Sequence, residues 1–349
     1  MKFSIGGRAI GKDQPVFIIA ELSANHNRKF DLAAETIKAA KEAGAEAIKL
    51  QTYTPDTITL DCDNEYFRIK QGTVWDGGTL YQLYREAYTP WEWQPKLKKL
   101  AEDMGLFCFS SPFDNTAVDF LEHMDVPAYK VASFEITDIP LIEYIASKGK
   151  PLIISTGIAT LCDIEEALNA CGRMGNDQVA LLKCTSSYPA PLEEMNLRTI
   201  PNLAETFNTV VGLSDHTLSI SVPAASVALG ARIIEKHLIL DRKSGGPDAA
   251  FSMEPEEFSA MVHFVRDVEK ALGTVSYTLS DRAKKSREFS RSLFVIKDMK
   301  TGEVLTGENV KSIRPGFGLH PKYFNYIVGR KINQNVKKGT PLNWSLIGE

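Results

Sequence analysis

Two apolar, strand-like stretches of this chain each end in a histidine. TVVGLSDH ends at His216, and IIEKH ends at His237. A neutral imidazole is a common ligand of divalent Zn, Mn, Fe or Co, although a single strand-end histidine is more often a hydrogen-bonded structural residue. Two histidines that end neighbouring strands favour a metal site completed by water or substrate oxygens. Such an open site lets the metal act as a Lewis acid.

Two lysines lie within strand-like stretches, Lys49 in AEAIKLQTY and Lys130 in AYKVAS. A strand lysine can extend to solvent, but a lysine buried among apolar strands needs an anionic partner because an unpaired buried charge is unfavourable. A substrate phosphate or carboxylate would supply that anion. A Schiff-base lysine is the alternative role. Neutral donors to the same anion would come from the hydroxyl groups of Ser133, Ser155, Ser186 and Ser214.

Two glutamates follow strand-like stretches in the same way. Glu21 ends PVFIIAE, and Glu135 lies shortly after AYKVAS. Both are candidates for general acid–base work. The alternative interpretation is that they are ion-pair partners of the two lysines.

The elements that must position these residues alternate along the chain. From about residue 16 to about residue 270, short apolar runs alternate with stretches of helical periodicity, as βα units do. Each run is nearly continuously apolar, as expected for parallel strands covered on both faces. Eight runs qualify as strands: PVFIIAELS, AEAIKLQTY, LFCFSSP, AYKVAS, KPLIISTG, VALLKCTS, NTVVGLSD and ARIIEKHL. We therefore predict a (β/α)8 TIM barrel.

A doubly wound sheet is the structural alternative. It usually carries a glycine-rich phosphate loop after its first strand, where this chain has AELSANH instead. In a TIM barrel the active site forms at the carboxyl ends of the strands. Those ends are all polar here, which is more than solvation requires.

The pattern changes near residue 273. A polar stretch, GTVSYTLSDRAKKSREFSRS, precedes short runs separated by turns. We predict a catalytic barrel domain at 1–275, a linker at 276–288 and a small mixed C-terminal domain at 289–349.

Composition excludes several classes of protein. The formal net charge of −4 gives no sign of a nucleic-acid or membrane partner. The five cysteines are irregularly spaced, which argues against a disulfide framework or zinc ribbon and fits a reducing cytoplasm. We see no signal peptide and no apolar run of the roughly 18 residues that span a bilayer.

Seven ordered motifs resemble one family. They are AELSANH, IKLQTY, YKVASFE, STG, KCTSSYP, GLSDH and EKH. Together they are similar to the sialic acid synthase family, and the C-terminal part is similar to that family's small antifreeze-protein-like (SAF) domain. QTYTPDTITL, FSSPFD and RPGFGLHPKY resemble the pseudaminic acid branch more than the N-acetylneuraminate branch, in which the first motif commonly reads AEIGINH.

The resemblance implies a reaction and a set of roles. The family condenses phosphoenolpyruvate with an open-chain acetamido sugar, giving a 2-keto acid and phosphate. It implies that His216 and His237 hold a divalent metal, Mn²⁺ foremost with Mg²⁺ or Co²⁺ as alternatives, and that Glu21 and Glu135 handle protons or sugar hydroxyls. Phosphoenolpyruvate would be bound by Lys49, Lys130, Ser133, Ser155, Ser186 and Ser214. The sugar side would be lined by Asn25, Gln51, Tyr188, Asp248 and Arg314.

Arg314, in SIRPGFG, is expected to reach the sugar from the small domain of a partner chain in a domain-swapped homodimer. Three alternative functions stay open from the residues alone: a Schiff-base barrel aldolase, a metal-dependent synthase of another 3-deoxy keto acid, and a non-catalytic sugar or antifreeze-type binder. Within the family, N-acetylneuraminate and legionaminic acid synthesis are the alternatives.

Overall fold

The computed structural model describes residues 3–70 and 72–348. The chain forms two compact units, Met1–Gly273 and Thr274–Glu349. Each unit has its own apolar core, so each is described separately.

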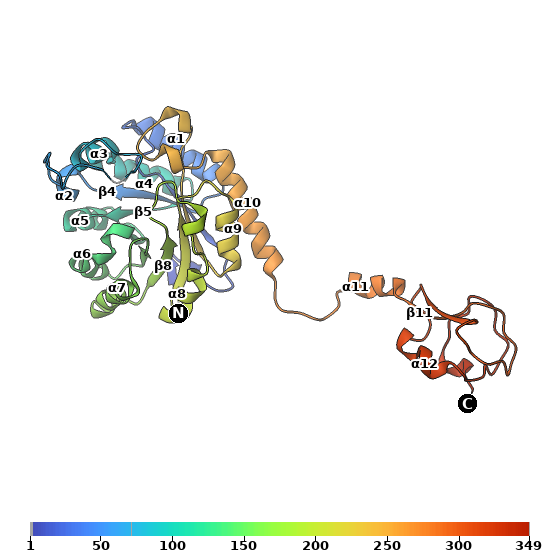
Figure 1. The fold of residues 1–349 in the computed structure, drawn as a ribbon. Helices are drawn as coiled ribbons and strands as arrows, with labels where there is room; N and C mark the ends of the chain where they lie inside the picture. The colour runs from blue at the N-terminus through green and yellow to red at the C-terminus, as the bar shows by residue number, and fades with distance from the viewer. Residues whose placement is uncertain (1–2, 71, 349) are drawn as a thin grey trace. The chain divides into compact units, whose positions relative to one another are not determined.

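The first unit is built around a closed barrel of eight parallel strands, in the spatial order β10-β3-β4-β5-β6-β7-β8-β9 (Figure 1). The predicted (β/α)8 barrel is therefore confirmed. The strands are β3 (Phe17–Glu21), β4 (Ala47–Thr52), β5 (Phe107–Pro112), β6 (Tyr129–Val131), β7 (Leu152–Ser155), β8 (Val179–Cys184), β9 (Val210–Asp215) and β10 (Ile233–His237).

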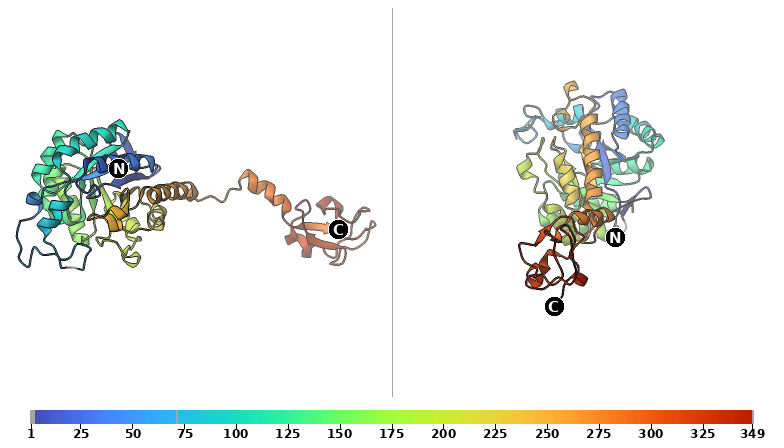
Figure 2. Two further views of the ribbon diagram at one scale, coloured as in Figure 1. Left: turned by 90° about the horizontal axis from the view of Figure 1, so that it is seen from above. Right: turned by 90° about the vertical axis from the view of Figure 1, so that its right-hand side faces the viewer.

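Helices follow every barrel strand and surround the barrel, as the views in Figure 2 also show. Each one packs an apolar face on the strands; in α7 the buried positions Ile164, Ala167, Ala170 and Cys171 recur at helical spacing. The principal helices are α1 (Phe30–Glu42), α4 (Gln94–Asp103), α5 (Asn115–His123), α6 (Ile139–Ala146), α7 (Leu161–Arg173), α8 (Thr199–Phe207), α9 (Ser221–Ala228) and α10 (Pro255–Leu272).

The opposite ends of the barrel differ. An antiparallel hairpin, β1 (Phe3–Ile5) and β2 (Arg8–Ile10), contributes Phe3 and Ile5 to the barrel core. It lies at the amino ends of the strands, where Arg8 pairs with Glu46 just before β4. At the carboxyl ends, a long excursion between β4 and α4 carries α2 (Pro55–Ile58), α3 (Leu80–Ala87) and η1 (Trp91–Trp93). Short 3-10 turns also interrupt the loops there, namely η2 (Ser133–Thr137), η3 (Leu192–Glu194), η4 (Arg242–Ser244) and η5 (Ala249–Phe251).

Strand alternation decides which polar side chains enter the barrel. In β10, Glu235 and His237 share one face, while Lys236 points the other way and pairs with Asp215 of β9 at 2.7 Å. Both partners of that pair are fully buried, between the strands and the helical layer. Lys236 and Asp215 are thus structural partners outside the barrel lumen.

The second unit is small and mostly irregular. Its antiparallel pair, β11 (Ser292–Val295) and β12 (Val310–Ile313), carries Leu293, Val295 and Val310 into a core of its own. The other elements are α11 (Asp281–Ser286), η6 (Arg287–Phe289), η7 (Pro321–Tyr323), α12 (Phe324–Ile327) and η8 (Trp344–Leu346). The stretch predicted as a linker, 276–288, contains α11.

None of the helices in the described part of the chain is both long enough and apolar enough to cross a membrane.

Candidate active site

A buried cluster of charges lies at the carboxyl ends of β10, β3 and β4. The register places His237 beside Glu21 and Glu21 beside Lys49. The Lys49 Nζ atom lies 2.6 Å from Glu21 Oε2, 3.5 Å from Glu235 Oε1 and 3.4 Å from Ser111 Oγ. One ammonium group therefore holds two carboxylates, and all three side chains are buried.

The protonation of this cluster follows from burial and mutual charge. Burial raises the pKa of Glu21 to about 7, and Glu235 adds to the rise although Lys49 opposes it. Burial alone would lower the pKa of Lys49, but the two carboxylates more than offset this and raise it. The pKa of Glu235 is lowered because Lys130 and Lys49 outweigh its burial. Lys49 is therefore a fixed cation, and Glu21 titrates near neutral pH.

Lys130 of β6 provides a second buried cation. Its Nζ donates to Ser155 Oγ at 2.7 Å and to the carbonyl of Val131 at 2.9 Å. Burial lowers its pKa, with the charge of Lys49 acting in the same direction and Glu235 opposing. None of its direct partners here is a carboxylate, so an incoming anion would meet an under-neutralised ammonium group.

Hydroxyl groups gather beside this cation around Gly157. The Gly157 N–H donates to Ser133 Oγ at 3.2 Å. A Cβ atom at Gly157 would collide with the hydroxyls of Ser133 and Ser186 and crowd Cys184 Sγ. The absent side chain at Gly157 therefore leaves room for hydroxyl groups from two loops to converge. Ser214 joins the same lumen by donating to Glu235 Oε1 at 3.3 Å.

Glu135 lies in η2, directly after β6. Its Oε2 atom is buried and has no hydrogen-bond partner among the described residues. Burial raises its pKa to about 7, although Lys130 opposes the rise. A carboxyl group with a pKa near neutral can both give and take a proton at physiological pH.

The two histidine rings are neighbours in an edge arrangement, with centroids 5.3 Å apart. His216 Nδ1 lies 3.0 Å from the carbonyl of Thr185, so this nitrogen carries a proton and Nε2 is the atom left for a metal. Burial alone would lower the pKa of His216, but Cys184, whose Sγ lies 3.9 Å from Nδ1, and the Thr185 carbonyl raise it overall. His237 Nδ1 is buried and has no hydrogen-bond partner among the described residues. Burial and the nearby cations hold the pKa of His237 well below its usual range, so this imidazole is neutral. Both rings thus fit a divalent metal.

The protein supplies few further metal ligands. Within the described ranges, no group of three or more His, Cys, Asp or Glu side chains is placed to hold a metal ion. A metal bound by His216 and His237 would therefore complete its coordination with water or substrate oxygens.

A polar chain extends from the charge cluster toward the loops after β3 and β10. The Gln51 amide donates to Glu21 Oε1 and to Ser23 Oγ, each at 2.9 Å. The hydroxyl of Ser23 donates to Asp248 Oδ2, which also lies 4.0 Å from His237 Nδ1. Gln51 and Asp248 therefore belong to one network with the histidines.

An aromatic wall closes this side. Tyr188 lies 4.4 Å from the His216 ring and 5.0 Å from Phe251, measured between centroids. Trp75, from the excursion after β4, packs on Tyr188 at 5.3 Å and donates to the carbonyl of Pro247 at 2.8 Å. The wall limits water access to the histidine pair.

Two predicted residues stand apart from this network. The Asn25 amide nitrogen donates to the carbonyl of Leu238 at 3.0 Å and to Ser252 Oγ at 2.8 Å, so it joins two loops. Arg314 is exposed on the second unit. Contact of either residue with a sugar stays a prediction.

The predicted site residues do not include several contributors, although Glu235 and Ser111 stand among the polar ends of the strands. Strand alternation places Glu235, two residues before His237, in the lumen. Ser111 follows the same rule on β5. Trp75 and Phe251 lie in loops, where no periodic pattern could identify them.

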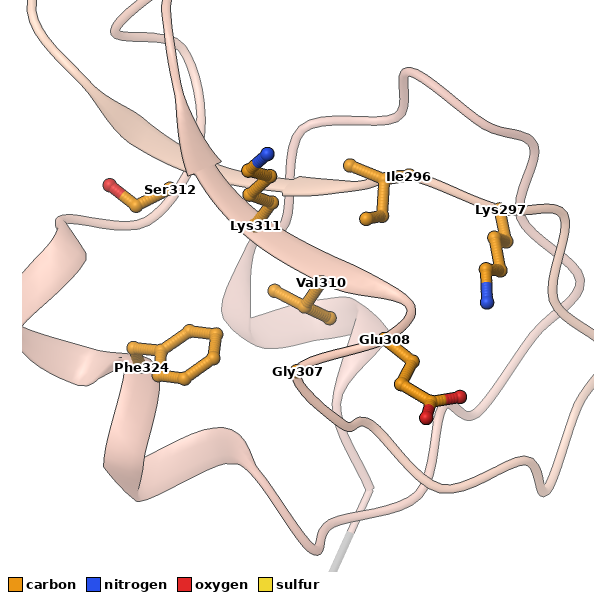
Figure 3. A pocket seen from close by; sticks show the side chains of 8 residues that line it. All are labelled: Ile296, Lys297, Gly307, Glu308, Val310, Lys311, Ser312 and Phe324. Carbon is orange, nitrogen blue, oxygen red and sulfur yellow. The ribbon is translucent and has the colours of Figure 1, made fainter.

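The second unit has an open hollow of about 540 Å³ (Figure 3). The apolar side chains of Ile296, Val310 and Phe324 line it beside Lys297 and Lys311. Its lining, completed by Gly307, Glu308 and Ser312, contains none of the predicted site residues.

Comparison with known proteins agrees with the fold and the motifs. Residues 36–277 match the NeuB family, and residues 290–347 match the SAF domain. The chain therefore belongs to the NeuB family of sialic acid synthases, and it carries a C-terminal SAF domain.

Three individual comparisons are informative. The chain is 48% identical over 333 residues to the pseudaminic acid synthase of Campylobacter jejuni subsp. jejuni serotype O:23/36 (strain 81-176), covering 95% of this chain and 97% of that protein. It is 46% identical over 331 residues to the pseudaminic acid synthase of Helicobacter pylori (strain ATCC 700392 / 26695), covering 95% and 97%. The crystal structure of N-acetylneuraminic acid synthetase from Leptospira borgpetersenii serovar Hardjo-bovis aligns with a TM-score of 0.73 at 31% identity, covering 83% of this chain and 96% of that one.

Proposed function

We propose that this protein is a pseudaminic acid synthase. It condenses phosphoenolpyruvate with 2,4-diacetamido-2,4,6-trideoxy-L-altrose and water to give pseudaminic acid and phosphate. The similarity to two pseudaminic acid synthases, at 48% and 46% identity over 95% of the chain, supports the product. The single observation that carries the chemistry is the buried pair of lysines beside two neighbouring histidines at one end of the barrel.

Phosphoenolpyruvate would occupy the side of the lumen that holds Lys49 and Lys130. Its carboxylate and phosphate would take charge-assisted hydrogen bonds from these ammonium groups and from the hydroxyl groups of Ser133, Ser155, Ser186 and Ser214. These contacts fix C3 of the enol toward the histidine side, where the sugar aldehyde would lie.

His216 and His237 would hold a divalent metal, Mn²⁺ in preference to Mg²⁺ or Co²⁺. When bound, this ion supplies Lewis-acid activation of the sugar aldehyde. The protein's own part is to orient the His216 ring, which the Thr185 carbonyl does, and to keep the His237 imidazole neutral, which burial does by lowering its pKa.

Glu21 and Glu135 would manage the protons. As C3 of phosphoenolpyruvate bonds to the aldehyde carbon, the aldehyde oxygen takes one proton, and the positive charge left at C2 accepts water. The attacking water gives up one proton and leaves a hydroxyl group on C2. The C2–O bond to phosphate then breaks as the C2=O bond forms, and the hydroxyl proton leaves with the departing phosphate. A pKa of about 7 allows either carboxyl group to serve as donor or acceptor in these steps.

The assembly and setting belong to the same proposal. Arg314 of one chain would reach the sugar bound by a partner chain in a domain-swapped homodimer. Each chain would consist of a barrel domain at 1–275, a linker at 276–288 and an SAF domain at 289–349. All five cysteines are free, which supports a reducing, cytoplasmic location.

A Schiff-base aldolase is the second candidate, because burial lowers the pKa of Lys130. Borohydride reduction in the presence of pyruvate would trap such a lysine. We expect no trapped adduct, since the synthase reaction forms no imine.

The deciding experiment measures phosphate release from phosphoenolpyruvate with Mn²⁺ across a panel of sugars. The panel contains the L-altrose substrate, its manno stereoisomer and N-acetylmannosamine. We expect the highest kcat/KM with the L-altrose sugar. A preference for the manno isomer would assign legionaminic acid synthesis, and a preference for N-acetylmannosamine would assign N-acetylneuraminate synthesis.

A further inference from the structure

Ser23 has a backbone conformation that serine rarely adopts. Its φ angle is +45°, in the left-handed region that favours glycine. It follows Glu21 and Leu22, at the point where β3 opens into the loop above the barrel, and it is buried. A non-glycine residue held in such a conformation is found mainly where the surrounding structure fixes it, often at functional sites.

The hydroxyl group gives a reason for serine at this position. Ser23 Oγ accepts a hydrogen bond from Gln51 Nε2 at 2.9 Å and donates to Asp248 Oδ2. The backbone N–H of Ala24 donates to the same carboxylate oxygen at 3.3 Å. Ser23 therefore connects one side chain on β4 to another in the loop after β10, two segments more than 190 positions apart in the sequence.

These bonds determine which atoms remain for a ligand. Both N–H bonds of the Gln51 amide are used, one by Glu21 and one by Ser23. The amide orientation is therefore fixed, with Oε1 directed away from these partners as an acceptor. Asp248 Oδ2 is likewise occupied by Ser23 and Ala24, which leaves Oδ1 as the second acceptor.

We propose that Ser23 is a positioning residue for sugar specificity, which orients Gln51 and Asp248 so that they present a fixed pair of acceptors to N–H or O–H donors of the acetamido sugar. This inference rests on the proposed synthase function and deepens it. The acceptor pair matches amide N–H and hydroxyl groups, and it would not match a phosphate or carboxylate. Ser23 therefore acts on the sugar and not on phosphoenolpyruvate.

Two substitutions separate the hydroxyl group from the backbone. Ser23→Gly removes the hydroxyl and relieves the left-handed backbone, whereas Ser23→Ala removes the hydroxyl and keeps the unfavourable conformation. We expect both variants to raise KM for the sugar about tenfold, which corresponds to about 1.4 kcal/mol. We expect KM for phosphoenolpyruvate to stay within about twofold in both, and Ser23→Gly to have the higher melting temperature of the two.

Asn208→Gly is the matched control. Asn208 also has a left-handed backbone, with φ of +48°, but it ends α8 away from the strand carboxyl ends. The Asn208→Gly substitution relieves the same kind of backbone conformation but does not change the network of Ser23, Gln51 and Asp248. Both KM values should therefore match those of the wild type.

A third variant tests whether Ser23 acts through its partner. In a Gln51→Met background the amide is absent and only Asp248 remains for Ser23 to orient, so Ser23→Ala should raise the sugar KM by less than tenfold. A purely structural role for Ser23 would give the same multiplicative effect in both backgrounds.

The outcomes are distinguishable. If the wild-type protein releases no phosphate with any acetamido sugar, the proposed synthase function itself is wrong. An active wild type whose Ser23 variants change the sugar KM less than threefold, or change both KM values equally, would overturn the role of Ser23 and leave the synthase intact. Full additivity with Gln51→Met would also overturn it.

Discussion

Replacement of Glu135 by glutamine should stabilise the barrel while it inactivates the enzyme. The Glu135 carboxyl is buried, and its Oε2 atom has no hydrogen-bond partner among the described residues. Burial raises its pKa from 4.5 to about 7. Glutamine has the same shape as the protonated acid and carries no charge, so it removes only the unfavourable ionised form.

The sign and size of the expected stability difference between Glu135→Gln and the wild type follow from proton linkage. Between pH 4.5 and about 7 the folded protein keeps a proton on Glu135 that the unfolded chain has lost, so the stability from this group falls as pH rises through that window. At about 1.4 kcal/mol for each pH unit between 4.5 and about 7, the full effect is about 3 to 4 kcal/mol. Glu135→Gln should therefore match the wild type near pH 4.5 and exceed its stability by up to about 3 to 4 kcal/mol at pH 8.

The assay is urea unfolding at several pH values, followed by tryptophan fluorescence. Trp75, Trp91 and Trp93 lie in the barrel unit, whereas Trp344 packs on Tyr323 in the second unit. A Trp344→Phe background therefore makes the signal report on the barrel. Phosphate release, measured in parallel, should fall by about 100-fold or more for a lost general acid–base group. A stability difference independent of pH, or a variant less stable than the wild type at pH 8, would refute the reasoning.

Three further outcomes are expected. Lys130→Met should raise KM for phosphoenolpyruvate about 10- to 150-fold, equivalent to roughly 1.5–3 kcal/mol, with a smaller change for the sugar; an unchanged phosphoenolpyruvate dependence would make Lys130 structural. His237→Ala should lose Mn²⁺ binding in equilibrium dialysis and lose activity while staying folded, whereas the exposed His263→Ala should bind like the wild type; equal binding by all three proteins would exclude this metal site. Mixtures of Glu135→Ala and Arg314→Ala should recover activity approaching about a quarter of the wild type by random dimer pairing, and no recovery after verified subunit exchange would mean that each chain completes its own site.

The sequence predicted the barrel because continuously apolar runs alternate with stretches of helical periodicity. The apolar runs were continuous, and the helix after each had buried positions at helical spacing, as in α7. The site followed from one topological rule, that strand carboxyl ends converge. That rule placed Lys49, Lys130, His216 and His237 at the same end of the barrel. It did not by itself predict which side chains point into the lumen and which point outward to the helices.

The site residues that come from loops could not be predicted from sequence periodicity. Ser23, Trp75, Asp248 and Phe251 meet around the histidines from segments with no periodic pattern. Their meeting depends on loop paths that local residue preferences do not determine. Asp248 was reached only through family resemblance.

Two sets of buried polar groups in this barrel differ in whether their hydrogen bonds are complete, and this difference distinguishes structural residues from functional ones. Lys236 and Asp215 form a fully buried pair whose hydrogen bonds are complete: the Thr217 carbonyl accepts from Lys236, and the Thr217 hydroxyl donates to Asp215. A complete network of this kind needs no ligand, and it lies outside the lumen. At the lumen end, by contrast, Asn25 Oδ1, Glu135 Oε2, Glu235 Oε2 and His237 Nδ1 are buried without hydrogen-bond partners among the described residues. Leaving buried polar atoms unpaired is costly. Their concentration at the carboxyl ends of the strands therefore indicates that this end is built to be completed by a ligand.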